Sequence, residues 1–343
     1  MAGRTIGMSR SAAHIRSAAT PGVDRAISSV PPRLSRRTTM LSALAVSVIY
    51  ATCFALIKSG LDLAPPLRFA GLRALVAGLA LLAVTIVRHE PLVPPRRVWL
   101  PLAALSLAAT TVAYGAMFLS PGRTGAGIAS VLGNAQPLVT VGLAAVFLGE
   151  RMTRGKTVAL VLGIAGVTLI AYPALAGPGA YGFSGALLAV AVSIGSAGGS
   201  VLIKRMGDLP SLLGVTAWSL ILGSVPLIVM SWIVERDESV TWSGTFIVLL
   251  LFLAVVGTAL ASFAWYWLVQ REDVGHLTLY LFLVPVLGLT IAAMVFGERV
   301  GLAEGAGVAL TIAGIGAAVL DTRATAGPHT APDPHAHAGT SIR

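Results

Sequence analysis

Long apolar stretches with almost no charge fill the chain from about residue 40 to residue 320, and short polar segments separate them. The stretches are continuously apolar rather than alternating, which favours helices over barrel strands. A helix satisfies its own backbone N–H and C=O groups, as lipid requires, and about 20 residues cross a bilayer. Ten windows are therefore predicted to be membrane-spanning helices, at residues 40–60, 66–87, 98–118, 125–147, 157–173, 182–203, 211–233, 243–268, 274–296 and 302–320.

The composition supports the same fold class. Apolar residues make up 56% of the chain and charged residues 11%, whereas a soluble domain carries roughly 25% charged residues. We therefore predict an all-α polytopic membrane protein. The single cysteine, Cys53, lies inside the first apolar stretch and is interpreted as a small packing residue. One cysteine excludes an intrachain disulfide.

The net charge of +10 is explained by membrane topology rather than by nucleic acid. The first 39 residues hold seven arginines and one aspartate among Ser, Ala and Pro, a composition typical of a disordered tail. Basic residues also concentrate in alternate loops, which by the positive-inside rule places those loops and both termini in the cytoplasm of a cell-membrane protein. These loop residues are Arg88, Arg96, Arg97, Arg151, Arg154, Lys156, Lys204, Arg205 and Arg271.

The chain repeats itself. At an offset of 148 residues, "NAQPLVTVGLAAVFLGER" aligns with "FLVPVLGLTIAAMVFGER", and near the start of each half "LIK" matches "LIK" at an offset of 146. This predicts two five-helix units, at residues 40–173 and 181–320, between disordered cytoplasmic tails at 1–39 and 321–343. An internal sequence repeat indicates that the fold is built from repeated structural units.

An odd number of helices in each unit predicts that the two units cross the membrane in opposite directions. Glu150 and Glu298, which end the matching apolar runs, would then lie at opposite faces and could not form a catalytic pair. We expect each Gly-Glu-Arg triplet to tie a helix end to its short loop by local ion pairing. Inverted repeats are the architecture of secondary transporters, which bind substrate near the midplane between the two halves. No enzyme activity is predicted.

These residues resemble the EamA branch of the drug/metabolite transporter superfamily. The resemblance covers roughly residues 40–320. It is carried by the proline of the fourth helix of each unit, the run to "GER", the Gly-rich fifth helix, "LIK" at the end of each first helix, and "LAPPLRFAGLRALVAGLALL" at the second helix. The aromatic-Gly-Asn pattern of the family's first helix is replaced here by "YATCF". The resemblance implies ten helices in two inverted repeats and transport of small molecules.

Polar side chains inside the predicted helices are candidates to line a substrate cavity. They follow helical spacing in both units, as in Ser106, Thr110 and Tyr114. For an individual Ser or Thr, a hydrogen bond between packed helices is the favoured alternative, whereas bulky polar groups favour a cavity. The cavity candidates are Tyr50, Arg73, Thr110, Tyr114, Asn134, Gln136, Ser196, Thr258, Ser262, Trp265 and Tyr280, and the predicted helix kinks are Pro137 and Pro285.

Charged and titratable residues near the membrane have a structural and a functional interpretation in the same way. Arg73 lies below the predicted interface, where it would attract an anionic group or bond to carbonyls of neighbouring helices. Lys58 and Lys204 are expected to extend to opposite interfaces. His276 beside Asp273 could handle protons, although a solvated interfacial histidine is the favoured interpretation.

The sequence predicts an exporter of amino acids or amphipathic metabolites that works by alternating access, driven by proton antiport or by the substrate gradient. The absence of a Walker motif argues against direct use of ATP, no metal or cofactor is expected, and no acidic residue falls mid-membrane. The expected partners are a small-molecule substrate and the bilayer, with no nucleic acid, in a monomer or homodimer. The alternatives are an importer or exchanger of this fold, or a non-transporting assembly or regulatory subunit.

Overall fold

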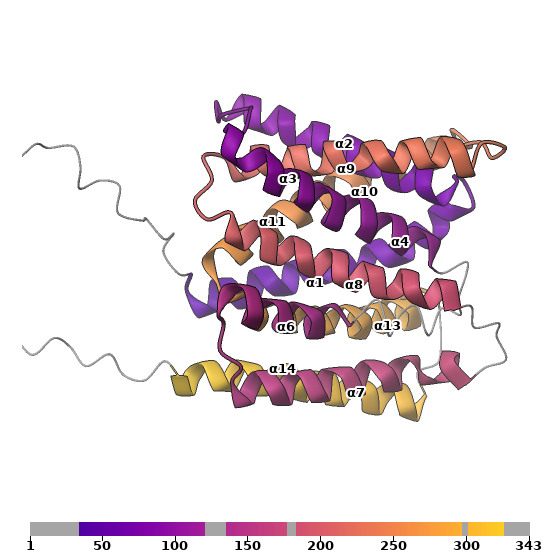
Figure 1. The fold of residues 1–343 in the computed structure, drawn as a ribbon. Coiled ribbons are helices and arrows are strands. Elements are labelled where there is room, and N and C mark those ends of the chain that lie inside the picture. Colours follow the sequence, from indigo (N-terminus) through magenta and orange to yellow (C-terminus); the bar gives the residue numbers. More distant parts are fainter. Residues whose placement is uncertain (1–33, 121–134, 177–182, 297–300, 326–343) are drawn as a thin grey trace, which may run out of the picture. The chain divides into compact units, whose positions relative to one another are not determined.

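The computed structural model describes residues 34–120, 135–176, 183–296 and 301–325, and all regular structure in these ranges is helical. This confirms the predicted all-α fold. The helices of the first half are α1 (Arg36–Leu61), α2 (Pro66–Val87), the 3-10 turn η2 (Arg96–Val98), α3 (Trp99–Leu105), the π-helix η3 (Ser106–Val112), α4 (Ala113–Leu119), α6 (Gln136–Leu148) and α7 (Arg154–Ala176) (Figure 1).

The second half follows the same order. Its third helix is again interrupted by a π-helix, and the start of its fourth helix is divided by a 3-10 turn. Its elements are α8 (Phe183–Arg205), α9 (Leu212–Val234), α10 (Gly244–Ala254), the π-helix η4 (Val255–Leu260), α11 (Ala261–Arg271), α12 (Val274–Thr278), the 3-10 turn η5 (Leu279–Phe282), α13 (Leu283–Phe296) and α14 (Leu302–Thr325).

Capping residues explain where two of these helices begin and end. α1 begins four residues before the predicted position because the Ser35 hydroxyl accepts from the Thr38 N–H. α6 ends at Gly149, whose positive φ of 67° suits the left-handed conformation that closes a helix. The predicted tails lie mostly outside the described residues, but α1 and α14 extend into them by a few residues.

The two prolines predicted to kink helices occupy different settings. Pro137 is the second residue of α6, in the first turn, where the missing N–H leaves no hydrogen bond unmade. Pro285 is the third residue of α13, directly after the 3-10 turn η5, so the irregular winding lies where Pro285 cannot donate to the Leu281 carbonyl.

Equivalent helices of the two repeats pack on each other. α2 packs along α9 and α7 along α14, while the contact of α6 with α8 matches that of α13 with α1. The colours of Figure 1 show that α7 and α14 run in opposite directions. An element that packs on its own counterpart lies at the pseudo-twofold axis relating the repeats. The axis therefore passes between α2 and α9 and between α7 and α14.

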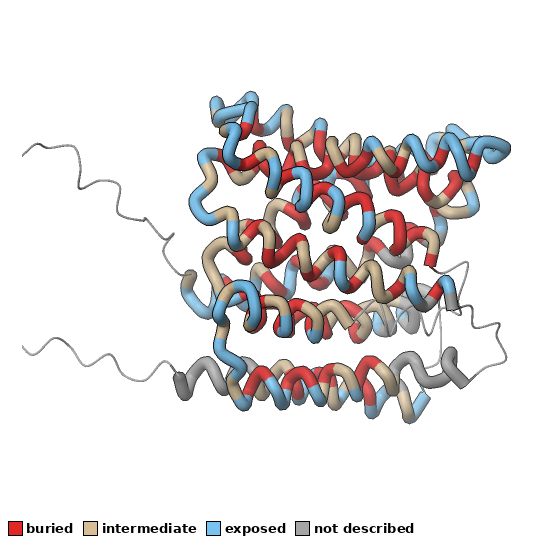
Figure 2. The backbone as a smooth tube through the Cα atoms, in the orientation of Figure 1, coloured by how far each residue is buried: buried red, intermediate tan, exposed pale blue. Residues whose placement is uncertain are grey.

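Many large apolar side chains of the helical body are exposed, and Figure 2 shows in pale blue where the exposed residues lie along the backbone. Leu100, Met294 and Leu302 are 83%, 82% and 96% exposed, as expected of a surface that faces lipid rather than water. Among the described residues, five segments are long and apolar enough to cross a membrane. They are Pro66–Val87, Arg96–Leu119, Leu187–Arg205, Leu212–Val234 and Gly244–Arg271, and shorter apolar helices lie at Gln136–Leu148, Val274–Gly288 and Gly305–Ala317.

Candidate functional site

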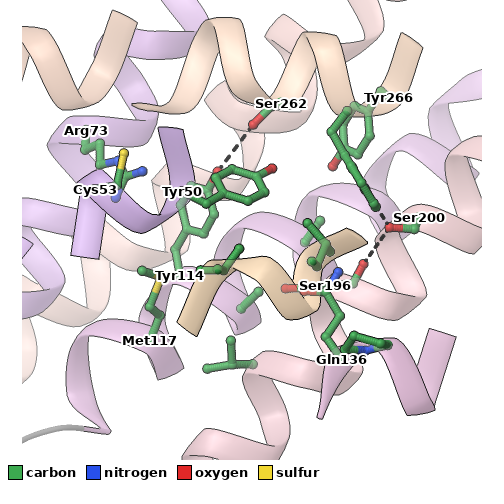
Figure 3. Close-up of a pocket in the computed structure, with 17 residues that line it drawn as sticks. Tyr50, Cys53, Arg73, Tyr114, Met117, Gln136, Ser196, Ser200, Ser262 and Tyr266 are labelled. Atoms are coloured by element: carbon green, nitrogen blue, oxygen red, sulfur yellow. Dashed lines mark hydrogen bonds between the residues drawn. The ribbon is translucent and has the colours of Figure 1, made fainter. Parts of the chain in front are cut away.

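A cavity of about 140 Å³ lies between helices of both repeats (Figure 3). Its wall is formed by α1 and α2, the segment η3–α4, α6, α8, α11 and the segment η5–α13. Seven of the eleven predicted cavity residues contribute to this wall. They are Tyr50, Arg73, Tyr114, Gln136, Ser196, Ser262 and Trp265.

Three of the other candidates are buried in helix contacts outside the cavity wall. Thr110 in η3 donates to the Ser219 carbonyl of α9, and Thr258 in η4 accepts from Arg73 Nε of α2 while it donates to the Leu253 carbonyl of its own helix. Tyr280 lies in η5 with its ring edge against His276. Hydrogen bonding between packed helices, the alternative considered for Ser and Thr, describes both threonines. Asn134 falls outside the described residues.

Side chains from opposite repeats meet in the cavity wall. The hydroxyls of Tyr114 and Ser262 are 3.4 Å apart, and these residues occupy equivalent positions, 148 apart, in the two repeats. Across the cavity, Trp265 Nε1 donates to Ser200 Oγ at 3.0 Å, and Ser200 Oγ donates to the Ser196 carbonyl (Figure 3). A contact between equivalent residues places this part of the cavity at the pseudo-twofold axis.

Four wall residues that carry a hydroxyl group or a sulfur atom were not among the eleven predicted cavity residues. Cys53 is three positions after Tyr50 and Ser200 four positions after Ser196, so helical spacing could have identified both. Tyr266 neighbours Trp265, and Met117 is three positions after Tyr114. Their place in the wall is set by how the helices pack against one another. These residues are Cys53, Met117, Ser200 and Tyr266.

Arg73 is the most unusual group in the wall, because it is a cation that is only 4% exposed. Its Nε donates to Thr258 Oγ1 and its Nη2 donates to the Gly257 carbonyl at 3.2 Å. The guanidinium carbon lies 5.5 Å from the centre of the Tyr114 ring, within cation–π range. No carboxylate pairs with Arg73 in the part of the chain that the structure describes.

The backbone carbonyl that bonds to Arg73 lies in the π-helix η4, where the backbone bonding departs from that of an α-helix. The Ala261 N–H donates to the Thr258 carbonyl, rather than to Gly257 as in a regular α-helix. The Gly257 carbonyl instead accepts from Arg73. Such π-helical turns occur frequently at functional sites.

One end of the cavity is sealed by apolar packing. Trp265 and Tyr266 of the wall belong to a buried cluster that continues towards the end of the bundle where α1 begins and α6 ends. Residues of four helices in this cluster have no exposed surface, so the part of the cluster that they form excludes water. They are Ala43, Ala144, Ile203 and Leu268, with Leu277 of α12 beside them.

A polar network joins the two repeats beyond this apolar seal. Glu150 accepts from the N–H groups of Val274 and Gly275, at 2.7 and 2.9 Å, and so caps the first turn of α12. Lys156 pairs with Glu150 at 3.3 Å and with Asp273 at 2.7 Å. Within its own repeat, Glu150 therefore pairs with Lys156 at the start of α7 and not with Arg151 of the triplet. Its bonds to the other repeat were not expected, and Glu298 lies outside the described residues.

The pKa values of the two carboxyl groups of this network are shifted in opposite directions. Burial raises the pKa of Glu150, and the neighbouring Asp273 raises it further against the two backbone N–H bonds. Burial also opposes ionisation of Asp273, but the Glu150 carboxyl and Lys156 together hold its pKa below the ordinary value. Asp273 is therefore the member of the pair that keeps its negative charge as the pH falls.

Proteins with similar sequences include transporters and efflux pumps. Residues 37–172 and 183–320 each match the model of the EamA-like transporter family. An uncharacterized transporter, YvbV, of Bacillus subtilis is 29% identical over 81% of this chain and 90% of its own length. A probable amino-acid metabolite efflux pump of Salmonella typhimurium is 31% identical over 82% of this chain and 94% of its own.

The fold also has a solved relative. One crystal structure superposes with a TM-score of 0.72 over 85% of this chain and 99% of its own, at 20% sequence identity. At that identity the likeness concerns the fold alone. The two matches to the family model together cover most of the chain, including every residue of the cavity wall.

Proposed function

This chain belongs to the EamA-like transporter family, and on that premise we propose that it is a secondary transporter that exports small metabolites, amino acids or amphipathic compounds among them. It works by alternating access. Similarity to a probable amino-acid metabolite efflux pump, at 31% identity, supports this choice of cargo and direction. The energy comes from the substrate gradient or from proton antiport.

The cavity is the observation that carries the proposal. It lies where the two repeats meet, which is where transporters with inverted repeats bind their substrates. Its wall mixes aromatic rings with hydroxyl groups and one amide, a combination that suits a molecule with both polar and apolar parts. Polar groups at this depth gain partners when water or substrate occupies the cavity, which offsets the cost of burying them.

The sealed end supports alternating access. Apolar residues of both repeats and the Glu150–Lys156–Asp273 network close one route to the cavity. A transporter must open each route in turn, so this network must break and reform in every cycle. We assign this end to the cytoplasm, because α1 begins there and because the basic loops gather there, and we place the protein in the cell membrane.

The test is substrate counterflow into proteoliposomes that contain the purified protein, with a panel of radiolabelled amino acids and amphipathic metabolites. Ser196→Phe places a ring in the cavity and should slow counterflow about tenfold or more. Leu107→Phe is the matched control, since Leu107 is 56% exposed on the outer face of η3, and it should leave counterflow unchanged. Counterflow that survives Ser196→Phe would remove the cavity from the proposal.

Direction and coupling need separate measurements. Uptake into vesicles of known protein orientation, with and without an imposed pH gradient, distinguishes an exporter from an importer or exchanger and detects proton antiport. If the folded protein moves no member of the panel, a non-transporting membrane subunit becomes the better assignment.

A further inference from the structure

We propose that Arg73 binds the carboxylate of the transported molecule, so that the substrates of this protein are organic acids or amino acids and not amines or amides. The proposal rests on the proposed transport function. It goes further by naming the chemical group that the cavity recognises and the residue that recognises it.

The charge balance of the cavity is the first argument. Arg73 is a buried cation, and among the described residues of the wall no aspartate or glutamate balances it. A buried charge without a counterion is costly in a membrane protein, and such charges usually mark a substrate or ion site. A bound carboxylate would supply the missing negative charge. A phosphate, with a charge of about −1.5 to −2, would exceed what one guanidinium balances.

The hydrogen-bonding capacity of Arg73 is the second argument. A guanidinium carries five N–H donors in a fixed plane. Two of them bond to Thr258 and to the Gly257 carbonyl, and the other three, all on the terminal nitrogens, have no bond in the described part of the chain. Of the two terminal nitrogens, Nη1 has no partner in that part of the chain and yet is not among the fully buried polar atoms that lack one, so it has exposed surface. Because Arg73 lines the cavity, the exposed Nη1 is placed to face it, and the remaining N–H groups of Nη1 and Nη2 together match the two oxygens of a carboxylate.

Arg73 is also held in position for such a ligand. The bonds from η4 fix one edge of the guanidinium, and the Tyr114 ring lies 5.5 Å away. Figure 3 shows Arg73 beside Cys53, next to Tyr50 and Tyr114. Because its orientation is fixed before binding, less side-chain entropy is lost when a carboxylate binds.

Comparison of the repeats argues against a purely structural role. The residue equivalent to Arg73 in the second repeat, at the offset of 146, is Ser219. Its hydroxyl donates to the Thr216 carbonyl of its own helix, while its backbone carbonyl accepts from Thr110. α9 therefore packs on η3 with the neutral Ser219 at the position where α2, which packs on η4, has Arg73. Packing of the second helix of a repeat on the π-helix of the other repeat does not require a cation. The charge therefore serves the cavity.

The rest of the wall indicates what accompanies the carboxylate. Tyr50, Met117, Trp265 and Tyr266 present aromatic rings and a thioether, which suit an apolar side chain. Since the described part of the wall offers no carboxylate of its own, an amine lacking an acid group would meet Arg73 as a like charge.

The experiment compares compounds that differ only at the acid and amine groups. The first series is leucine, 4-methylpentanoate, leucinamide and 3-methylbutylamine, and the second is phenylalanine, 3-phenylpropanoate, phenylalaninamide and 2-phenylethylamine. Binding is measured by thermal stabilisation of the purified protein in detergent, and transport by counterflow in proteoliposomes. The two acids of at least one series should bind about 10- to 100-fold more tightly than its amide and amine.

Variants assign that preference to Arg73. Arg73→Gln should abolish the preference for acids, and Arg73→Lys should keep part of it, because lysine retains the charge without the planar pair of donors. Arg68→Gln is the matched control. Arg68 lies five residues earlier on the same helix and bonds to Ser231 and to the Glu235 and Glu238 carbonyls outside the cavity, so the preference should be unchanged.

The outcomes separate this inference from the proposed function. Equal or stronger binding of amides or amines by the wild-type protein overturns the inference, whether or not any variant folds, and so does an acid preference that persists in Arg73→Gln. Counterflow without acid preference leaves the transporter and removes the Arg73 site. Acid binding through Arg73 without counterflow supports the site and counts against transport. Absence of both binding and counterflow for all eight compounds counts against both.

Discussion

The two π-helices of the protein occupy equivalent positions in the two repeats but form different junctions. At the first, η3 packs on α9, where Thr110 donates to the Ser219 carbonyl at 3.2 Å and Thr111 to the Gly223 carbonyl at 2.8 Å. Every group in these two bonds is neutral. Gly223 allows the close approach, since a Cβ there would lie 2.7 Å from the Ser106 carbonyl oxygen.

At the second junction, η4 packs on α2 and the equivalent threonine accepts a bond from a cation. Thr258 receives the Arg73 guanidinium, and the position equivalent to Gly223 holds Ala77. The two π-helices also differ in which side of a second close contact carries the glycine, the π-helix itself or the helix it packs against. Ala109 of η3 faces Gly199 of α8, whereas Gly257 of η4 faces Cys53 of α1.

The difference shows which features belong to the shared fold and which to the site. Both junctions keep a π-helix and a threonine, and each π-helix has a glycine at one close contact with a neighbouring helix, Gly223 of α9 for η3 and Gly257, which faces α1, for η4. Glycine lets two helices approach closely in lipid. Only the second junction adds a charge, and that charge faces the cavity. Divergence between repeats therefore identifies functional residues better than the features they share.

The largest effect is expected at the glycine of the first junction. In Gly223→Ala the new methyl group would meet Thr110 and the Ser106 backbone, so the helices must separate, and the free energy of unfolding should fall by about 3 kcal/mol. The measurement is the unfolding transition of the purified protein in detergent. The control is Ala77→Gly at the equivalent site, which should cost only about 1 kcal/mol. Similar losses in both variants would mean that the junctions are equally tight.

The second close contact offers a further test. In Gly257→Ala the added Cβ would lie 2.4 Å from Cys53 Sγ, and destabilisation of about 2 kcal/mol is expected. Adding Cys53→Gly recreates the Ala–Gly pairing of the first junction and should recover most of that loss. Unfolding measured for both single variants and the double variant forms a double-mutant cycle. Additive effects would show that the two residues do not share one space.

Much of the fold could be predicted from the sequence, because its strongest signals are local. Lipid demands long apolar helices, so most predicted windows coincide with helices of the structure to within a few residues. The offset of 148 predicted that Thr110 and Thr258 are equivalent, as are Tyr114 and Ser262. The π-helices were not predicted, because they depend on contacts between helices and leave no pattern in composition.

The cavity was predictable in part for a similar reason. Bulky polar residues such as Gln136, Tyr114 and Trp265 fit poorly between packed helices, and these three do line the cavity. Thr110 and Thr258 are also polar residues in predicted helices, but their hydroxyl groups form hydrogen bonds in the packed helices instead of lining the cavity. Likewise, an ion pair of Glu150 was expected, although its partner is Lys156 and not Arg151, and nothing in its own repeat could reveal that it caps α12 of the other repeat.

The threonines of the two junctions should differ when replaced by valine. Thr258→Val removes the acceptor of the Arg73 Nε donor, which leaves part of a buried cation unsatisfied, and should destabilise the protein by about 1.5 kcal/mol. Thr110→Val removes only a neutral bond to a helix carbonyl and should cost about 0.6 kcal/mol. Unfolding transitions of the two variants check this order. An equal cost would show that Arg73 finds another acceptor without penalty.

The smallest effect is expected where the repeats meet on the axis, at Tyr114 and Ser262. Their hydroxyls are 3.4 Å apart, near the limit for a hydrogen bond, and the open cavity lets water replace either partner. Tyr114→Phe should therefore change the free energy of unfolding by less than about 0.5 kcal/mol, and Ser262→Ala by a similar amount. The ring of Tyr114 stays in place over Arg73, so acid preference in the binding series should also survive Tyr114→Phe. A double variant that loses much more stability than the two single variants together would show that the hydroxyls substitute for each other. A large loss in Tyr114→Phe alone would mean that this bond holds the repeats together, and the neutral contact at the axis would then matter as much as the charged junction beside it.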